Sequence, residues 1–390
     1  MLRDTQGVTS SHAVLPMEVV PIVARFNGTA TCEEIARTAT RELGERIPVD
    51  VVVRLATELE DALFVDGPPY RRARARIERA FADAAVREAS HAGGAYHDDP
   101  EKLTTYIERD CLGTKNGALN GDAGPKGKLV GLVAPHIDPW RGARCYGVAY
   151  DALANALPGD TETFILLGTS HAPMREPFTL CRKAFATPLG PLAADLESID
   201  ALAGACEFDP YADLFNHKRE HSLEFQAVFL RHLLGEARAA KAKIVPILAG
   251  LGEQQHKGTS PRGSKAIERF YEALRGIVER RRAVVIAGAD LAHVGPRFGD
   301  ARPFDEGERR DLDARDRASL AHAEELDAEA FWKDVAGDLD TRRVCGLGPM
   351  YSLLRAIDPA ARGSVRHYEQ TVDPEEGSIV SHAAVGFYAR

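Results

Sequence analysis

Three histidines lie shortly after short apolar runs of the sequence. In chain order the pairs are LVGLVA (129–134) with His136, TFILLG (163–168) with His171, and AVVIAG (283–288) with His293. Neutral imidazole is the commonest protein ligand of transition metals, and two histidines with one carboxylate form the facial triad of non-haem Fe(II) enzymes. Asp290, just ahead of His293, supplies such a carboxylate. We therefore expect His136, His171 and Asp290 to hold a metal ion, with iron(II) preferred over other divalent transition metals.

A fourth histidine, His221, opens an amphipathic segment and follows Glu220. A neighbouring carboxylate fixes the tautomer of an imidazole and raises its pKa, which suits general acid–base chemistry. We assign catalytic roles to His221 and His293, and His293 is the alternative to Asp290 as third metal ligand. The alternative for His221 is an ordinary polar first turn of a helix, where the helix dipole favours acidic residues.

Two polar segments supply candidate substrate contacts. Asp138 and Arg141 follow His136, and His91 lies in the segment 87–100. An arginine binds a carboxylate through two parallel hydrogen bonds, so Arg141 is a candidate anion anchor. We expect Asp138, Arg141 and His91 to bind substrate, while a purely structural Asp138–Arg141 pair fits the spacing equally well.

The apolar runs also predict the architecture. Two further runs, 243–250 and 383–389, belong to the same series, and amphipathic segments such as 220–234 and 264–281 lie between the runs. Continuous apolar strands separated by helices are typical of a sheet covered on both faces. We predict an α/β fold with a central mixed or largely parallel sheet flanked by helices. Ligands of open α/β sheets bind beyond the carboxyl ends of the strands, where the histidines would gather.

The chain is expected to have two domains. Their boundaries are 1–85 for a small helical region and 86–390 for the α/β domain. In the first, Thr31 and Glu34 have the spacing of a capping box, and Asp50 is a candidate N-cap for the next helix. A Gly-Pro-Pro turn at 67–69 and an Arg-rich helix at 70–88 follow. We expect a winged-helix-like or similarly small regulatory module, or a docking subdomain without a ligand.

The composition excludes several classes of protein. The chain has 390 residues, of which 44% are apolar and 27% charged, as in globular domains and unlike disordered chains. The net charge of −9 argues against nucleic-acid binding, and no apolar run approaches the ~18 residues of a membrane span. The first residues lack the apolar core of a signal peptide, so we expect a cytoplasmic protein without membrane partners. The six cysteines form no CxxC pair, which indicates reduced thiols.

Seven motifs resemble, in order, those of the MEMO family, whose bacterial members are labelled AmmeMemoRadiSam system protein B. They are REASHAGGAY, APHID, LLGTSHAP, EHSLEFQ, IAGADLAHVGPRF, VCGLGP and SHAAVGF, and they extend from about Arg87 to the end of the chain. The resemblance implies the fold of class III extradiol dioxygenases, which are non-haem iron enzymes. It also implies AMMECR1-like and radical SAM proteins of the same system as partners.

The same resemblance places His136 and His171 at the two metal-binding histidines and His221 at the histidine of the EHS motif. The third metal position of the family falls on Ala292, which has no ligating atom. This departure shifts the expectation for the third ligand to Asp290 or His293, with Asp290 preferred. The alternative is that Asp290 only accepts hydrogen bonds from backbone amides of the turn. If the site is held only by His136, His171 and water, a cysteine introduced at position 292 is expected to tighten metal binding.

Together these observations favour a metal-dependent oxygenase of a small-molecule substrate, with aromatic compounds as the first class to test. The alternative is a non-enzymatic metal-binding or partner-binding protein on the same fold, which the alanine at position 292 favours. A metal-dependent hydrolase would need the same residues with a metal-bound water.

Overall fold

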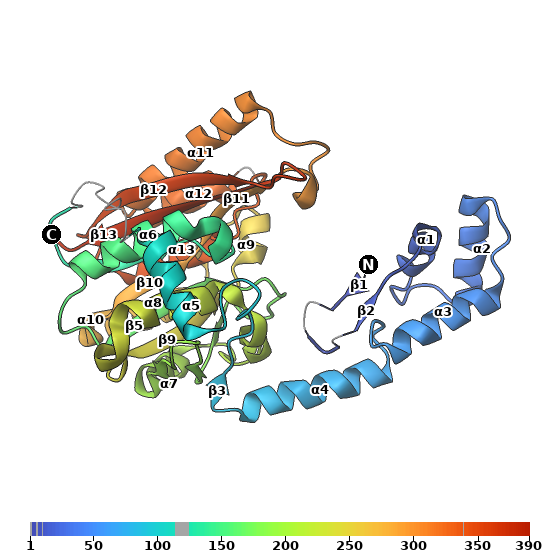
Figure 1. The fold of residues 1–390 in the computed structure, drawn as a ribbon, viewed down its shortest axis with the longest axis horizontal. Helices are drawn as coiled ribbons and strands as arrows, with labels where there is room; N and C mark the ends of the chain where they lie inside the picture. The colour runs from blue at the N-terminus through green and yellow to red at the C-terminus, as the bar shows by residue number, and fades with distance from the viewer. Residues whose placement is uncertain (1, 5–6, 10, 114–124, 338) are drawn as a thin grey trace. The chain divides into compact units, whose positions relative to one another are not determined.

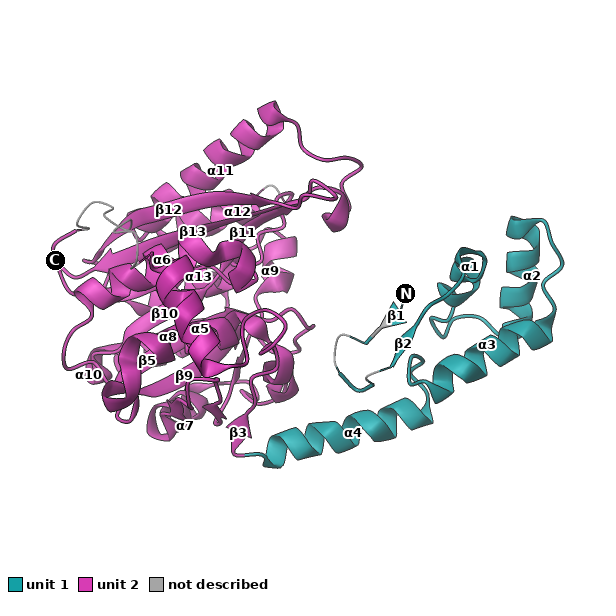
Figure 2. Cartoon of the chain, viewed as in Figure 1, with its two compact units in different colours: residues 1–84 teal, residues 85–390 magenta. Residues whose placement is uncertain are grey.

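The computed structural model describes residues 2–4, 7–9, 11–113, 125–337 and 339–390. The chain divides into two compact units, Met1–Ala84 and Ala85–Arg390, and each is described by itself (Figure 1, Figure 2).

The first unit is mainly helical. Its elements are β1 (Leu2–Arg3), β2 (His12–Ala13), η1 (Met17–Val19), α1 (Val20–Val23), α2 (Cys32–Leu43), α3 (Val49–Asp61) and α4 (Pro68–Asp83). The predicted capping box is present at the start of α2, where the side chains of Thr31 and Glu34 each accept a hydrogen bond from the other's backbone N–H. Asp50 is not the N-cap of α3. Pro48 takes that place, and Asp50 lies in the first turn, where the helix dipole favours its charge. The winged-helix interpretation stays a prediction.

The second unit is built on one large sheet. Among the described residues its nine strands are β4 (Leu129–Ala134), β5 (Thr163–Thr169), β6 (Phe178–Leu180), β8 (Ala193–Ala194), β9 (Lys243–Ala249), β10 (Val284–Gly288), β11 (Asp290–Val294), β12 (Arg362–Val372) and β13 (Ile379–Tyr388). The order is β11-β13-β4-β10-β5-β9-β6, with β12 beside β13 and β8 beside β9. The four central strands β4, β10, β5 and β9 are parallel, whereas β13 joins β4 antiparallel. The prediction of a mostly parallel central sheet is confirmed.

Side chains of the central strands alternate between two apolar cores. In β5, Phe164 and Leu166 enter one core, whereas Ile165 and Leu167 enter the other. This alternation is the period of a β-strand. Because both faces are buried, such strands appear in the sequence as continuous apolar runs, which is why the predicted runs coincide with β4, β5, β9, β10 and β13.

Helices cover both faces of the sheet (Figure 1). One core includes α5 (Pro100–Tyr106), α6 (Pro139–Ala156) and α8 (His221–Ala239), and the other includes α7 (Leu196–Ala205), α10 (Lys265–Arg281), α11 (Glu306–Glu324), α12 (Ala328–Ala336) and α13 (Leu347–Ala356). Shorter elements are β3 (Val86–Arg87) paired with β7 (Ala184–Phe185), η2 (Ile107–Cys111), η3 (Leu214–Arg219), α9 (Gly252–His256), η4 (Pro261–Gly263) and η5 (Pro296–Phe298). Within the described ranges, no helix has the length and apolar character needed to cross a bilayer.

Candidate metal centre

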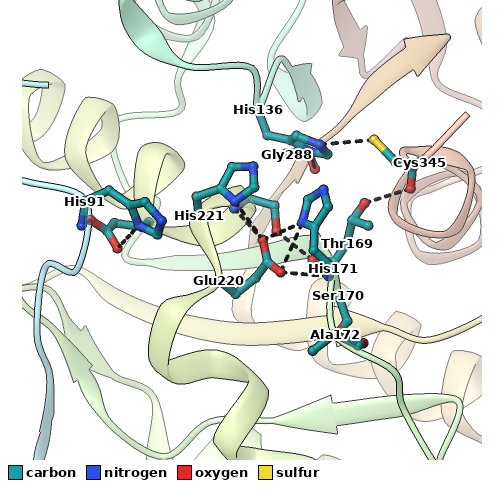
Figure 3. Close-up of polar contacts among 12 residues, drawn as sticks. His91, His136, Thr169, Ser170, His171, Ala172, Glu220, His221, Gly288 and Cys345 are labelled. Atoms are coloured by element: carbon teal, nitrogen blue, oxygen red, sulfur yellow. Dashed lines mark hydrogen bonds and ion pairs between the residues drawn. The ribbon is translucent and has the colours of Figure 1, made fainter. Parts of the chain in front are cut away.

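Three imidazoles gather where the parallel strands β4 and β5 end. His136 follows β4, His171 follows β5, and His221 is the first residue of α8. Their donor nitrogens lie within 4.8 Å of one another, and the ring centroids are 4.5, 5.1 and 5.4 Å apart (Figure 3). In the part of the chain that the structure describes, no other group of three His, Cys, Asp or Glu residues has this mutual spacing. The structure thus brings His136 and His171 together and adds His221 to them.

The outer nitrogen of two of these rings is held by a hydrogen bond. His136 Nδ1 lies 2.9 Å from the Gly288 carbonyl oxygen, which can only accept, so Nδ1 carries the proton. His171 Nδ1 lies 3.0 and 3.2 Å from the two Glu220 carboxylate oxygens and donates in the same way. In the neutral form of each ring, the Nε2 lone pair is left for a ligand. Metal-binding histidines usually have this arrangement, because the outer hydrogen bond fixes the tautomer and the ring orientation.

Glu220 links the end of β5 to the start of α8 through its side chain. As N-cap of α8, its carboxylate accepts hydrogen bonds from Ser222 N and His171 N, both at 2.9 Å. Burial opposes ionisation of Glu220, but the facing imidazoles and N–H donors outweigh burial and hold its pKa well below the usual range. Burial also opposes protonation of His171, and there the Glu220 charge prevails and raises the pKa. Burial lowers the pKa of His221 to about 3, so this ring is neutral at neutral pH.

A buried ion pair lies behind His221. The Arg87 guanidinium pairs with the Glu224 carboxylate and donates a hydrogen bond to the Glu220 carbonyl oxygen at 2.9 Å. The same carboxylate accepts further hydrogen bonds from Ser90, His91 and Tyr96. These contacts fix the His91 ring, whose centroid lies 5.6 Å from that of His221. His91 therefore supports the ring of His221 and is not among the residues that line the cavity described below.

β11 contributes Asp290 and His293 through an irregularity in its pairing. Asp290 pairs with His382 and His293 with Val380, so a step of three residues on β11 matches two on β13, as in a β-bulge. A regular strand would place positions 290 and 293 on opposite faces. Because of the bulge, both residues line the same cavity.

Ala292 is not part of this cavity. It is fully buried in a separate apolar cluster with Val294, Leu312 and Ile379, and its N–H donates to Ser381 Oγ at 2.9 Å. The expectation that a cysteine at position 292 would tighten metal binding stays untested, but this buried position does not face the cavity. A side chain there would enter the contact between β11 and α11.

Asp290 lies beside His136 but outside the three-imidazole group. Its Oδ1 accepts a hydrogen bond from His136 N at 2.9 Å, and its Oδ2 lies 3.7 Å from His136 Nε2. Burial would raise the pKa of Asp290, but the neighbouring imidazoles lower it. The buried carboxylate therefore places a negative charge next to the donor nitrogen of His136.

The three imidazoles form part of the wall of a cavity of about 370 Å³. Its other lining residues are Ile137, Asp138, Arg141, Asp290, His293, Arg297, Phe298, Asp373, Ser378 and Val380. Of the predicted substrate contacts, Asp138 and Arg141 lie here. Asp138 also caps α6 by accepting a hydrogen bond from Trp140 N at 2.8 Å. Beside the imidazoles, the cavity combines two arginines and three aspartates with apolar side chains.

Sequence reasoning missed two contributors. The sequence pairs Glu220 with His221, whereas the imidazole to which its carboxylate is hydrogen-bonded is that of His171, and its nearest oxygen lies 3.5 Å from His221 Nδ1. Cys345 was not singled out at all, although its Sγ lies 3.1 Å from His136 Nε2. The available signal for Cys345 was its place in the motif VCGLGP.

Comparison with known proteins agrees with these motifs. Residues 87–386 match the family described as Memo-like protein. A MEMO1 family protein of Aquifex aeolicus is 25% identical over 391 residues, covering 100% of this chain and 96% of that protein. A MEMO1 family protein of Thermus thermophilus is 27% identical and covers 77% of this chain and 83% of its own length.

Among solved structures, an uncharacterised protein of Escherichia coli K12 covers 66% of this chain at 14% sequence identity. The TM-score of 0.38 is too low to establish a common fold. The family match spans most of the chain and starts at the first residue of the motif that contains Arg87 and His91. The chain belongs to the Memo-like family.

Proposed function

We propose that the second unit is a metal-dependent oxygenase centre in which His136, His171 and His221 hold one iron(II) ion. The observation that carries the proposal is that their donor nitrogens all lie within 4.8 Å of one another. The hydrogen bonds from His136 and His171 to Gly288 and Glu220 support it, because they leave both Nε2 atoms unprotonated.

The third ligand in this proposal is His221, whereas the sequence favoured Asp290. His221 belongs to the close group and is neutral, as a ligand must be, because burial lowers its pKa to about 3. Asp290 instead supplies a negative charge next to His136, which offsets part of the charge of a bound cation. Three histidines leave coordination positions open, as catalytic metal sites require.

Iron(II) at this place would supply electrons to O₂ and open positions for O₂ and substrate. The protein's own part is to bind and orient the substrate. Phe298 and Val380 offer apolar surface, and the Phe298 ring meets His293 edge-on with centroids 5.0 Å apart. Arg141 offers a guanidinium for an anionic group on the substrate. These walls support a small aromatic compound as substrate, in which an anionic group would bind Arg141 beside the aspartates that share the lining.

Within this cavity, His293 is the candidate acid–base group in place of His221. It lines the cavity without belonging to the three-imidazole group, and its Nδ1 lies 3.2 Å from the Leu291 carbonyl oxygen. Nδ1 therefore holds a proton in the neutral ring, and Nε2 is left to accept one from substrate. AMMECR1-like and radical SAM proteins of the same system remain proposed partners, and a cytoplasmic location remains part of the proposal.

Anaerobic purification followed by metal analysis tests the proposal. We expect about one iron per chain in the wild type and its loss in His136→Ala, with His322→Ala as a control histidine far along α11. O₂ uptake is then measured with catechols and indoles. Iron in the control and none in His136→Ala, with substrate-dependent uptake, supports the oxygenase. Iron without uptake for any substrate favours the non-enzymatic alternative, and equal iron in both variants contradicts the site itself.

A further inference from the structure

The cavity beside the imidazoles has a charged part that the proposed metal site does not use. Arg141 is the third residue of α6, Arg297 belongs to η5, and Asp373 lies in the turn between β12 and β13. All three residues line the cavity, and Arg297 Nη1 lies 3.9 Å from Asp373 Oδ2. Three separate segments of the chain therefore bring opposite charges to one part of the wall.

Asp373 is held by its own turn and is ionised at neutral pH. Its Oδ1 accepts hydrogen bonds from Glu375 N at 2.9 Å and from Glu376 N at 3.0 Å. These N–H donors, and after them the charges of Arg141 and Arg297, lower the pKa of Asp373. Within the described ranges no hydrogen bond uses its Oδ2, so this oxygen is left to accept one from a ligand.

The two arginines of the cavity differ from a neighbouring arginine that has a structural role. Arg343, outside this cavity, donates to the two Asp300 carboxylate oxygens at 2.8 and 3.1 Å. Among the described residues no such hydrogen bond engages the guanidinium of Arg141 or Arg297, and the 3.9 Å contact of Arg297 is too long to be one. The N–H donors of both guanidinium groups are therefore available to a ligand.

This arrangement of charges fits a zwitterion better than a simple anion. Two guanidinium groups beside a carboxylate oxygen can bind a ligand carboxylate and a ligand ammonium group at the same time. In an α-amino acid both groups are attached to one carbon, so the wall must present a cation and an anion side by side, as Arg297 and Asp373 do. A ligand with an anionic group alone would face the unpaired charge of Asp373, which disfavours its binding.

The remaining walls of the cavity can receive the side chain of such a ligand. Ile137, Phe298 and Val380 are apolar, and the Phe298 ring packs edge-on against His293. The cavity volume of about 370 Å³ lies near the lower end of the roughly 300–1,000 Å³ that small-molecule sites occupy. These dimensions and surfaces suit a single amino acid with an aromatic side chain.

We propose that the cavity binds a free aromatic α-amino acid as the substrate of the metal centre. Arg141 and Arg297 bind its carboxylate, Asp373 binds its ammonium group, and its ring lies between the apolar side chains and the imidazoles. This inference rests on the proposed oxygenase function, for which it names the substrate class. Arg297 and Asp373 then determine specificity, because each recognises a charged group that simple catechols and indoles lack.

Calorimetric titration of the full, anaerobically purified chain tests the assignment with three probes. Phenylalanine has both charged groups, phenylpropionate has only the carboxylate, and phenethylamine has only the ammonium group. The variants are Arg297→Gln, which removes a guanidinium, and Asp373→Asn, whose amide oxygen can still accept the hydrogen bonds of its turn. Arg302→Gln is the matched control, because Arg302 follows η5 in the chain but pairs with Glu308 and does not line the cavity.

We expect phenylalanine to bind more tightly than either probe that has a single charge. Arg297→Gln should weaken the binding of phenylalanine and phenylpropionate by roughly 10–100-fold, but not that of phenethylamine. Asp373→Asn should weaken the binding of phenylalanine and phenethylamine by a similar factor, but not that of phenylpropionate. Arg302→Gln should change none of the three affinities. A variant that only disturbed the fold would weaken all three probes alike.

Two results overturn the amino-acid assignment: phenylpropionate that binds as tightly as phenylalanine, or a wild type that does not bind phenylalanine at millimolar concentration. Iron analysis of the same samples separates this failure from that of the proposed function. Iron that depends on His136 in a protein that rejects phenylalanine overturns the substrate class alone. Absence of His136-dependent iron overturns the proposed function, and the cavity is then no substrate site of a metal centre even if it binds phenylalanine.

Discussion

The parallel strands β4 and β5 and the antiparallel strand β11 deliver side chains to the same cavity in different ways. After β4 and β5 the chain leaves the sheet, and His136 and His171 project from the loops beyond the strand ends. At β11 the contributing residues lie within the strand, and a bulge turns both Asp290 and His293 inward.

The two groups of residues differ in the contacts that hold their side chains. The two strand-end imidazoles have their Nδ1 atoms held by Gly288 and Glu220, whereas the β11 residues come to line the cavity together because of an irregular step in the pairing with β13. In the proposed function, the strand-end residues hold the metal together with His221, while the β11 residues adjust charge and substrate binding around it. Four variants test that division of roles.

The largest effect is expected for His171→Ala. It removes a donor nitrogen and leaves the Glu220 carboxylate without its imidazole partner. Metal affinity should fall by more than the about 10–100-fold typical of losing an outer partner. Titration of the metal-free protein with iron(II) under anaerobic conditions measures the affinity. If His171→Ala binds as tightly as His293→Ala, the contrast between strand ends and β11 fails.

Glu220→Gln should have the next largest effect. Glutamine keeps the length of the side chain and can still accept from Ser222 N, so α8 should keep its N-cap. The charge that orients the His171 ring is lost, and metal affinity should drop by about 10–100-fold. Circular dichroism checks that the helix content is unchanged, and the same titration measures affinity. Unchanged affinity would mean that Glu220 is only a helix cap.

A smaller loss is expected for Asp290→Asn. The amide oxygen can still accept the hydrogen bond from His136 N, so the loop after β4 should stay in place. Only the negative charge near His136 Nε2 disappears, and we expect metal affinity to fall by less than in Glu220→Gln. An affinity loss as large as that of His171→Ala would instead identify Asp290 as a direct ligand.

Ala292→Cys should leave metal affinity unchanged. Position 292 is fully buried against Leu312 and Ile379, so the added sulfur overfills an apolar contact away from the cavity. Overpacking of this kind typically costs about 1–3 kcal/mol of unfolding free energy. Urea unfolding measures the cost, and iron titration measures affinity. Tighter binding in this variant would show that β11 can present position 292 to the site, against the bulged register.

The regular parts of this fold were predictable from sequence because both faces of the central strands are buried. LVGLVA and TFILLG are β4 and β5, and their histidines lie where the strands end. β11 was not predicted, because the bulge interrupts the alternation of its side chains between the two faces of the sheet. Regular alternation would place His293 on the face opposite Asp290. Register depends on the partner strand β13, which local sequence does not reveal.

Contacts between segments far apart in the sequence explain why Cys345 and the true imidazole partner of Glu220 were not predicted. Cys345 meets His136 across 209 positions of the chain, and Glu220 meets His171 across 49. Nothing in the local sequence around Cys345 indicates which imidazole lies opposite. The interpretation of Glu220 as a partner of its immediate neighbour His221 was reasonable locally, but helix capping turns the carboxylate toward the strand end.

The Arg87–Glu224 ion pair has a consequence for how the chain can be cut or extended. The second unit starts at Ala85, and Arg87 is already fully buried, with hydrogen bonds to the backbone just ahead of His221. Removing one partner of such a pair typically costs about 3–5 kcal/mol. Truncation of the chain up to residue 84 therefore keeps the Arg87–Glu224 ion pair. Removal of three further residues would delete Arg87, the buried partner of Glu224 in α8. The family match also begins at residue 87.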